Sequence, residues 1–175
     1  MNIELTDEIL AIDVHTHALA SAREDTDSHE HAEHNSAMQK YFGRDFKTPT
    51  VHDLAQIYRE EKMMCVVFSL DSSWVTGEPN AVSNEEILEI AAEYPRTVIP
   101  FSSVDPHSGQ RGAREVRRLA EMGTRGFKFH PSSQAFYPND RDVYPILEAI
   151  EETGTIALFH SGHTGAGAGV AAVEQ

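Results

Sequence analysis

The stretch Ile12-Asp13-Val14-His15-Thr16-His17 ends in two histidines one residue apart. Its apolar residues are typical of a β-strand, in which residues i and i+2 point to the same face. We therefore expect the imidazoles of His15 and His17 to converge on one point, as two ligands of a single metal ion must. Neutral imidazole is the commonest metal ligand and suits zinc, manganese or iron. Two buried, hydrogen-bonded core histidines are the alternative interpretation.

Four further apolar runs follow the first one and alternate with helical patterns. The runs centre on Val67, Phe101, Lys128 and Leu158, and the helical patterns span residues 50–62, 83–94, 112–122 and 140–153. This alternation predicts a parallel sheet with helical crossovers, and hence the α/β class. An open doubly wound sheet and a (β/α)8 barrel both fit this order. No repeat or linker interrupts it, so residues 1–175 are expected to form one domain.

Composition and charge narrow the class of protein. Acidic residues outnumber basic residues by 28 to 14, for a formal net charge of -14. Such a charge disfavours nucleic acid and anionic membrane surfaces as partners. No apolar run reaches the ~20 residues of a membrane span, and the N-terminus lacks a signal-peptide pattern. The single cysteine, Cys65, indicates a buried core thiol in a reducing compartment, the cytoplasm, with a catalytic thiol as the alternative.

The last apolar run also ends in a histidine, His160, which precedes Ser161 and Gly162. His160 closes a strand that reads as buried, and the glycine lets the backbone approach a ligand closely. It is therefore a third candidate metal ligand, with a hydrogen-bonded core histidine as the alternative. His163 is close enough in sequence to contact the substrate as a catalytic group, and an ordinary loop histidine is its alternative.

The run near residue 128 reads Gly126-Phe127-Lys128-Phe129-His130-Pro131. Strand alternation places Lys128 and His130 on one face and the two phenylalanines on the other. A lysine within a buried strand is costly unless it is paired or functional. Lys128 is a candidate to hold a substrate carboxylate or, if carbamylated, to bridge two metals, and snorkelling to the rim is the alternative. His130 is a candidate metal ligand or proton shuttle.

Three further segments carry less specific patterns. Asp105 follows the third run and either lines the pocket or shapes the turn before a proline. Residues 20–39 form a long polar stretch with a second histidine pair, His29 and His31, which we interpret as a lid or surface loop because its side chains are not pre-positioned. Residues 165–169 are glycine-rich but lack the Lys-Ser/Thr ending of a phosphate loop.

Taken together, these motifs resemble the amidohydrolase superfamily. The resemblance is strongest to the branch of aminocarboxymuconate-semialdehyde decarboxylase and related aromatic-acid decarboxylases, hydratases and hydrolases. The matching segments are residues 13–17, 126–131 and 158–162. The resemblance implies a (β/α)8 barrel of the TIM type with one divalent metal ion, usually zinc, with manganese as the alternative. It also implies that His15, His17 and His160 are ligands of that ion.

The resemblance sets an expectation for the extent of the barrel. Members of the superfamily complete the site with a histidine on the sixth strand and an aspartate on the eighth, which handles the proton. Typical barrels run to ~250 residues, whereas the sequence ends at Gln175, just after its fifth strand. We therefore expect a barrel that is truncated after about the fifth strand, with an exposed sheet edge at the strand that precedes His160.

The leading hypothesis is a metal-dependent hydrolase or lyase of decarboxylase type that acts on a small carboxylate or carbonyl substrate. The metal lowers the pKa of a bound water to about 7 and polarises the substrate oxygen. Lys128 binds the substrate, and His130 and His163 are the candidate catalytic groups. One alternative is a non-catalytic metal-binding fragment or a half-barrel that needs a partner, and a homo-oligomer stays open. Another is an open α/β sheet that binds a nucleotide.

Overall fold

The structure, a computed structural model, describes residues 8–23 and 48–162. Its strands are β1 (Ala11–His17), β2 (Met63–Phe68), β3 (Val98–Ser102), β4 (Gly126–Phe129) and β5 (Ile156–Phe159). The strands form one sheet in chain order, and all neighbours are parallel. A doubly wound sheet reverses its strand order at a switch point. The sequential order therefore excludes the open doubly wound sheet and agrees with the expected barrel type.

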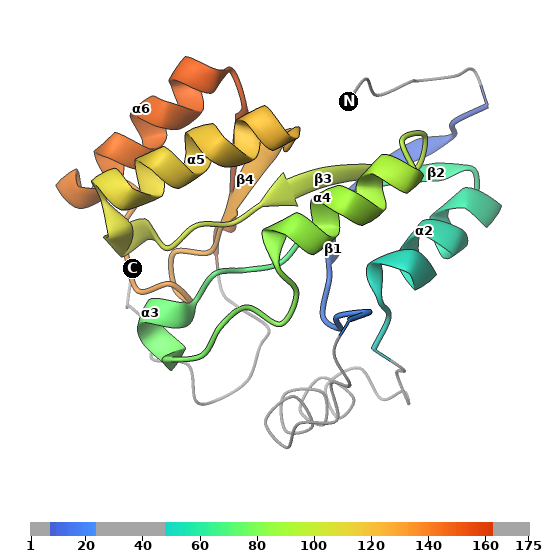
Figure 1. The fold of residues 1–175 in the computed structure, drawn as a ribbon, viewed down its shortest axis with the longest axis horizontal. Coiled ribbons are helices and arrows are strands. Elements are labelled where there is room, and N and C mark those ends of the chain that lie inside the picture. The colour runs from blue at the N-terminus through green and yellow to red at the C-terminus, as the bar shows by residue number, and fades with distance from the viewer. Residues whose placement is uncertain (1–7, 24–47, 163–175) are drawn as a thin grey trace.

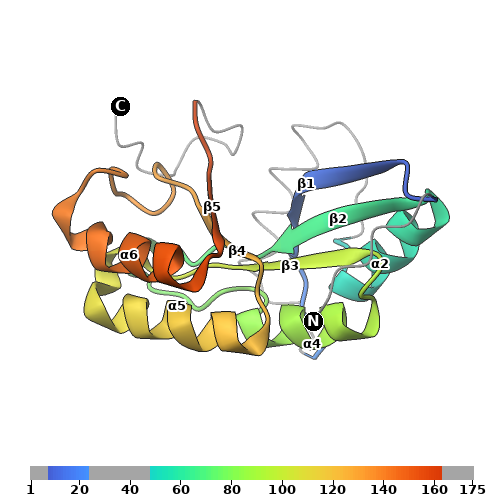
Figure 2. The ribbon, with the colours of Figure 1, turned by 90° about the horizontal axis from the view of Figure 1, so that it is seen from above.

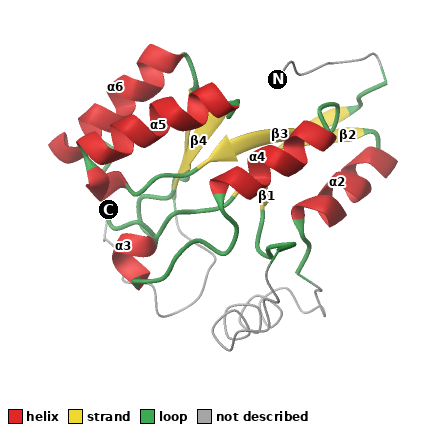
Figure 3. Cartoon of the chain, in the orientation of Figure 1, coloured by secondary structure: helices red, strands yellow, loops and turns green. Residues whose placement is uncertain are grey.

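Helices connect the strands and cover one side of the sheet (Figures 1 and 3). They are α2 (Val51–Glu60), α3 (Ser73–Thr76), α4 (Asn84–Glu93), α5 (Gln110–Met122) and α6 (Tyr144–Thr153), with 3-10 turns at Pro106–Ser108 and Arg141–Val143. Seen from above, the sheet curls, and β1 and β5 rise on the side away from the helices (Figure 2). The four expected helices are confirmed, whereas α3 and the 3-10 turns were not expected. In the described ranges, no helix is long and apolar enough to cross a bilayer.

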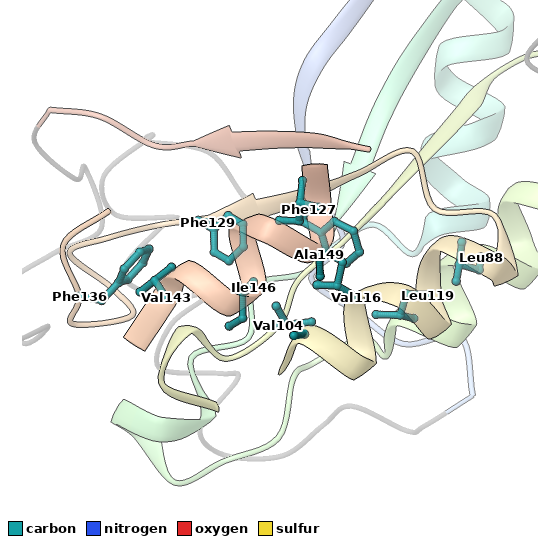
Figure 4. Close-up of a cluster of buried hydrophobic side chains, with 12 residues drawn as sticks. Leu88, Val104, Val116, Leu119, Phe127, Phe129, Phe136, Val143, Ile146 and Ala149 are labelled. Carbon is teal, nitrogen blue, oxygen red and sulfur yellow. The ribbon is translucent and has the colours of Figure 1, made fainter. Parts of the chain in front are cut away.

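β4 separates an apolar layer from a basic one. Phe127 and Phe129 point toward α5 and α6, where they pack with Val116 and Ile146 (Figure 4). Burying each such side chain contributes about 2 kcal/mol to the free energy of unfolding. Lys128 points to the opposite face, inside the curl of the sheet, and its Nζ lies over the Phe68 ring. The alternation expected from the sequence is therefore present in β4.

β1 departs from regular pairing between Asp13 and Thr16, a stretch that includes His15. Asp13 pairs with Cys65, and Thr16 pairs with Val67. Three steps along β1 thus match two steps along β2, which is a β-bulge with one extra residue. Bulges bend a strand and re-aim its side chains, and they are frequent beside functional sites.

The chain just after β1 is anchored to α4. Ser83 caps α4 by accepting a hydrogen bond from the Glu86 N–H at 3.2 Å. The Glu86 carboxylate does not take part in capping this helix. It accepts hydrogen bonds from the Ser21 hydroxyl and the Ala22 N–H instead, both at 2.7 Å. The buried carboxylate of α4 therefore fixes the segment that follows the two β1 histidines.

Cys65 is a core residue of β2. Its side chain is buried and unpaired with any other cysteine, and burial raises the pKa of the thiol to about 12. A nucleophilic cysteine requires a lowered thiol pKa. The structure therefore favours the core interpretation of Cys65 over the catalytic one.

Candidate metal and substrate site

His15 and His17 lie together at the carboxyl end of β1. Their Nε2 atoms are 3.2 Å apart, and both rings pack edge-on against Phe68. Two nitrogen ligands of one tetrahedral zinc ion, each about 2.0–2.1 Å from it, are about 3.3 Å apart. The pair is thus spaced as two ligands of a single ion would be.

The Asp13 carboxylate and the Tyr58 hydroxyl fix the β-bulge that orients the two imidazole rings. Asp13 accepts hydrogen bonds from the His15 N–H at 2.9 Å and from the Tyr58 hydroxyl at 2.6 Å. The Tyr58 oxygen also lies 3.3 Å from the Thr16 hydroxyl. The Tyr58 hydrogen bond is the main cause that holds the pKa of Asp13 below its ordinary value, so Asp13 is a carboxylate at neutral pH. Tyr58 of α2 therefore fixes the strand next to His15.

His160, just after β5, brings a third imidazole to the site. Its ring centroid lies 6.2 Å from that of His15, and its ring stacks on His130 at 4.0 Å. The Nε2 of His160 is buried and has no hydrogen-bond partner in the part of the chain that the structure describes. An unsatisfied buried polar atom costs about 1–3 kcal/mol. Coordination to an ion is one arrangement that removes this cost.

The three histidines fit a metal ion only in part as they stand. Within residues 8–23 and 48–162, no group of three or more His, Cys, Asp or Glu side chains is arranged to hold a metal. The structure brings His15 and His17 to coordination spacing and places His160 beside them. The donor set, three imidazoles, suits zinc, whereas manganese prefers a site that also supplies oxygen ligands.

Lys128 and His130 extend the site along β4. Lys128 is 1% exposed, and its Nζ lies 5.2 Å from the centroid of Phe68, the ring that both β1 histidines contact. This cation–π contact offsets part of the cost of burial. The buried position of the side chain shows that it does not snorkel to the rim. Burial also lowers the pKa of Lys128.

Burial and mutual repulsion keep the imidazoles neutral. Burial, followed by the charges of His15 and Lys128, lowers the pKa of His17 to about 4. Burial, followed by the charges of His160 and Lys128, also lowers the pKa of His130 to about 4. The pKa of His15 is lowered as well, mainly by burial. Neutral imidazole is the form that binds metal, so His15 and His17 have the protonation state of metal ligands at neutral pH.

A buried hydrogen-bond network supports β4 from below. Gln134, 1% exposed, accepts from the His130 N–H and donates to the Asp71 carbonyl, both at 2.7 Å. The Ser103 hydroxyl donates to the Lys128 carbonyl at 2.9 Å and accepts from the Asp71 N–H at 3.1 Å. The loops after β2, β3 and β4 therefore share one network. No sequence pattern indicated Gln134, because its partners are distant in the chain.

Asp105 lies in the turn that its sequence suggested. Its carboxylate accepts from the His107 N–H at 2.9 Å and caps the 3-10 turn. It also lines a cavity of about 430 Å³ formed with residues of α4, α5 and the loops after β2 and β3. The lining of that cavity includes none of the candidate histidines and not Lys128. Asp105 is therefore not part of the histidine site.

Several candidates fall outside the residues that the structure describes. They are His163, the pair His29 and His31, and the glycine-rich residues 165–169. The roles considered for them stay predictions from the sequence.

Comparison with known proteins identifies the family and the fold. Residues 12–175 match the family model of the amidohydrolases. The 5-carboxyvanillate decarboxylase from Sphingomonas paucimobilis is 16% identical, with a TM-score of 0.58 over 85% of this chain and 51% of that chain. An uncharacterized TIM-barrel protein from Bordetella bronchiseptica is 18% identical, with a TM-score of 0.63 over 92% of this chain and 58% of that chain.

A third solved structure carries a metal and a small molecule. It is a 5-carboxyvanillate decarboxylase from Novosphingobium aromaticivorans complexed with manganese and 4-hydroxy-3-methoxy-5-nitrobenzoic acid. It is 16% identical, with a TM-score of 0.52 over 91% of this chain and 53% of that chain. The chain thus spans little more than half the length of these structures. At such identities they establish the fold alone.

The family model matches most of the chain. Its match runs from Ile12 in β1 to the end of the sequence and so includes every candidate ligand. No curated protein matches the sequence. The five parallel strands in sequential order and the curl of the sheet agree with the barrel type of the solved neighbours. On these grounds, the chain belongs to the amidohydrolase family.

Proposed function

We propose that this chain forms the divalent-metal and carboxylate-binding part of a hydrolase or decarboxylase that acts on a small carboxylate or carbonyl substrate. The observation that carries the proposal is the 3.2 Å separation of the His15 and His17 Nε2 atoms, beside a His160 Nε2 that has no hydrogen-bond partner among residues 8–23 and 48–162. Membership of the amidohydrolase family supports it. A solved neighbour that binds manganese and a nitrobenzoic acid also supports it.

His15, His17 and His160 would hold the ion, which is zinc or manganese. The ion supplies a Lewis acid that polarises a substrate oxygen and lowers the pKa of water. The chain supplies neutral imidazoles and a fixed strand. Asp13 and Tyr58 hold the β-bulge that contains His15, so the His15 and His17 rings would need little reorganisation to meet the ion, whereas His160 would have to approach them.

Lys128 is assigned to the substrate carboxylate. Its ammonium group is buried, and no acidic side chain pairs with it among residues 8–23 and 48–162. A buried charge without a partner costs several kcal/mol, and an anionic ligand would offset that cost. The protein is strongly acidic overall, so this buried cation is a local site for an anion that the bulk of the surface would repel.

His130 and His163 are assigned to the chemistry. His130 is next to Lys128 on the same strand face and stacks on His160, so a substrate bound by Lys128 would lie within its reach. His163 follows His160 by three residues and lies outside the described residues. Hydrolysis and decarboxylation are distinguished by product, because only decarboxylation releases carbon dioxide from the carboxylate.

Metal titration of the purified protein tests the central claim. After removal of metal with a chelator, we expect isothermal titration with zinc or manganese to show one equivalent bound. The double variant His15→Ala/His17→Ala should lose this binding. His52→Ala is the matched control, because His52 belongs to α2 and contacts Tyr94, away from the site. Retention of the same metal affinity in the double variant would sink the proposal.

Turnover separates the enzyme from a metal-binding fragment. The metal-loaded protein is mixed with hydroxylated benzoic acids that carry a second carboxylate and, separately, with esters or lactones of such acids. Carbon dioxide is measured for the acids, and hydrolysis products are measured for the esters and lactones. Turnover that Lys128→Met removes, with metal content unchanged, supports the proposed role of Lys128. Metal binding without turnover of any carboxylate would favour the non-catalytic alternative.

A further inference from the structure

The hydrogen bonds around His130 decide which of its ring nitrogens carries the proton. The Ser133 N–H donates to His130 Nδ1 at 3.3 Å, and the Ser132 hydroxyl lies 3.1 Å from the same nitrogen. A backbone N–H can only donate, so Nδ1 must present a lone pair. The proton of the neutral ring is then on Nε2. We propose that His130 is a fixed Nε2–H donor to a substrate oxygen, and that Gln134 is the positioning residue that keeps it so.

This tautomer removes His130 from the set of metal ligands. A ring that binds metal through Nε2 carries its proton on Nδ1, and that proton usually goes to a carboxylate or a carbonyl. In His130 such a proton would meet the N–H of Ser133. His160 differs, because its Nε2 is buried and has no partner among the described residues. Of the two stacked rings, one is therefore suited to donate a hydrogen bond and the other to bind an ion.

The amide of Gln134 has one orientation that satisfies its surroundings. Its Oε1 accepts from the His130 N–H at 2.7 Å. Its Nε2 donates to the carbonyls of Asp71 at 2.7 Å and Val104 at 3.4 Å. A flipped amide would set NH₂ against an N–H and oxygen against two carbonyls. Gln134 thus ties the backbone of His130 to the loops after β2 and β3.

Two backbone hydrogen bonds fix the turn that contains Ser133. The Gln134 N–H donates to the His130 carbonyl at 2.9 Å, and the Phe136 N–H donates to the Pro131 carbonyl at 3.1 Å. Between these bonds Ala135 has a φ of 52°, in the left-handed region that non-glycine residues rarely adopt. Such strain persists only where the surroundings fix the backbone. The donor to Nδ1 is therefore built into the loop.

The consequence for substrate binding rests on the proposed function, whereas the tautomer itself does not. With Nδ1 held to the loop, Nε2–H is on the opposite edge of the ring. Lys128 and His130 would then offer two different donors from one strand face. Lys128 supplies charge, and the neutral His130 supplies a hydrogen bond of fixed direction that stabilises a substrate oxygen. This pairing suits a carboxylate that has a neighbouring carbonyl or hydroxyl oxygen.

Nuclear magnetic resonance tests the tautomer in metal-free protein. The chain is labelled with ¹⁵N in its 10 histidines and examined at pH 8, where an ordinary histidine is neutral. Long-range ¹H–¹⁵N correlations separate protonated from unprotonated ring nitrogens, and His130→Gln assigns the His130 signals. We expect one species with a bare Nδ1 and a protonated Nε2. A proton on Nδ1, or signals averaged between the two tautomers, would overturn the inference.

Two variants test Gln134 as the positioning residue. Gln134→Met fills a similar volume without the amide, and we expect the His130 signals to become an average of both tautomers. Asn84→Ala is the matched control, because the Asn84 amide bonds both backbone groups of Ser103 at 2.9 Å without contacting His130. It should keep the single tautomer. A single Nε2–H species in folded Gln134→Met would remove the role assigned to Gln134.

A second Gln134 variant and the absence of metal and substrate from both measurements keep the tests of the tautomer separate from the test of metal binding. If Gln134→Met does not fold, Gln134→Asn keeps the amide but shortens its reach by one methylene, and averaging of the His130 signals is expected there too. Neither measurement uses a metal or a substrate. Failure of the metal titration and failure of the tautomer assignment are therefore independent results.

Discussion

β1 and β4 each carry two basic side chains at alternate positions, and the two strands hold them in different ways. His15 lies within the β-bulge of β1, at the edge of the sheet, and His17 follows the bulge. Lys128 of β4, a strand that is paired on both sides, is 1% exposed, and His130 just after the strand is 7% exposed. The same spacing in sequence therefore produces a partly exposed pair, in which His15 is exposed and His17 half-buried, and a buried pair suited to a ligand's oxygens.

The contacts that hold the two pairs of side chains also differ. Two side chains, Asp13 and Tyr58 of α2, hold the backbone of the β1 pair through hydrogen bonds. A network that joins three loops holds the β4 pair. We expect the β1 pair to tolerate a change in its supports without unfolding of the chain, and we expect added volume in β4 to disturb the packing around it. Three substitutions test this difference.

The largest effect is expected from Gly126→Ala in β4. A Cβ at Gly126 would lie 2.5 Å from the Phe101 ring and 2.6 Å from the Ile156 carbonyl oxygen. The carbonyl belongs to the β5 backbone and cannot move aside without disturbing the sheet. Overpacking of this kind costs about 3 kcal/mol, measured as the free energy of unfolding in urea.

Gly77→Ala is the control for this prediction. Gly77 has a φ of 75° with open space around it, so the added methyl costs only the strain of the left-handed backbone, about 1 kcal/mol. A loss in Gly126→Ala no larger than in this control would show that β4 is not tightly enclosed. The packing around β4 would then be no tighter than that around an exposed turn.

A smaller effect is expected from Tyr58→Phe beside β1. The substitution removes the hydroxyl that donates to Asp13 at 2.6 Å, at a cost of about 1.5 kcal/mol for a hydrogen bond to a charged group. Metal affinity should fall about tenfold, as is typical when a support of a ligand is removed. Tyr94→Phe is the control, because its hydroxyl makes only a 3.4 Å contact with His52.

The same variant has a predicted pH dependence. The Tyr58 hydrogen bond lowers the pKa of Asp13 from its ordinary 3.8. Its stabilising effect is fully present above that value and is lost as the pH falls through the lowered pKa. The difference in stability between the wild type and Tyr58→Phe should therefore shrink in acid. A difference that stays constant down to pH 2 would show that Asp13 is not the partner that matters.

The sequence predicts the parts of this molecule that depend on periodicity. The two-residue repeat of a strand explains why His15 meets His17 and why the Lys128 face differs from the Phe127 face. The helical repeat predicts α2, α4, α5 and α6. It does not predict α3, because Ser73–Thr76 is too short for an apolar stripe.

Contacts between distant segments could not be predicted in the same way. Tyr58 and Asp13 are 45 residues apart, and Gln134 and Asp71 are 63 apart. The sequence around one partner of such a pair does not indicate which residue the other partner is. The stacking of His130 on His160 likewise depends on the pairing of β4 with β5. The sequence therefore indicates the candidate ligand residues, whose role stays a prediction, but it does not indicate the residues that orient them.

The smallest effect, of opposite sign, is expected from Lys128→Met. Met matches the length and volume of the lysine and needs no partner, so removing the buried charge should raise stability at pH 7 by about 1 kcal/mol. Burial lowers the pKa of Lys128, which means that the unfolded chain binds its proton more tightly than the folded one. Wild-type stability should therefore gain from a rise in pH toward the ordinary lysine value of 10.5.

The Met variant lacks that gain, so the two unfolding free energies should converge between pH 7 and pH 10. Lys62→Met is the control, because Lys62 is exposed and its replacement should leave both stability and its pH dependence unchanged. A Lys128→Met variant that is less stable than the wild type at pH 7 would mean that the ammonium group has a stabilising partner in the folded protein. Greater stability would instead identify Lys128 as a residue that folding alone does not favour, which is the property expected of a side chain retained to bind an anion.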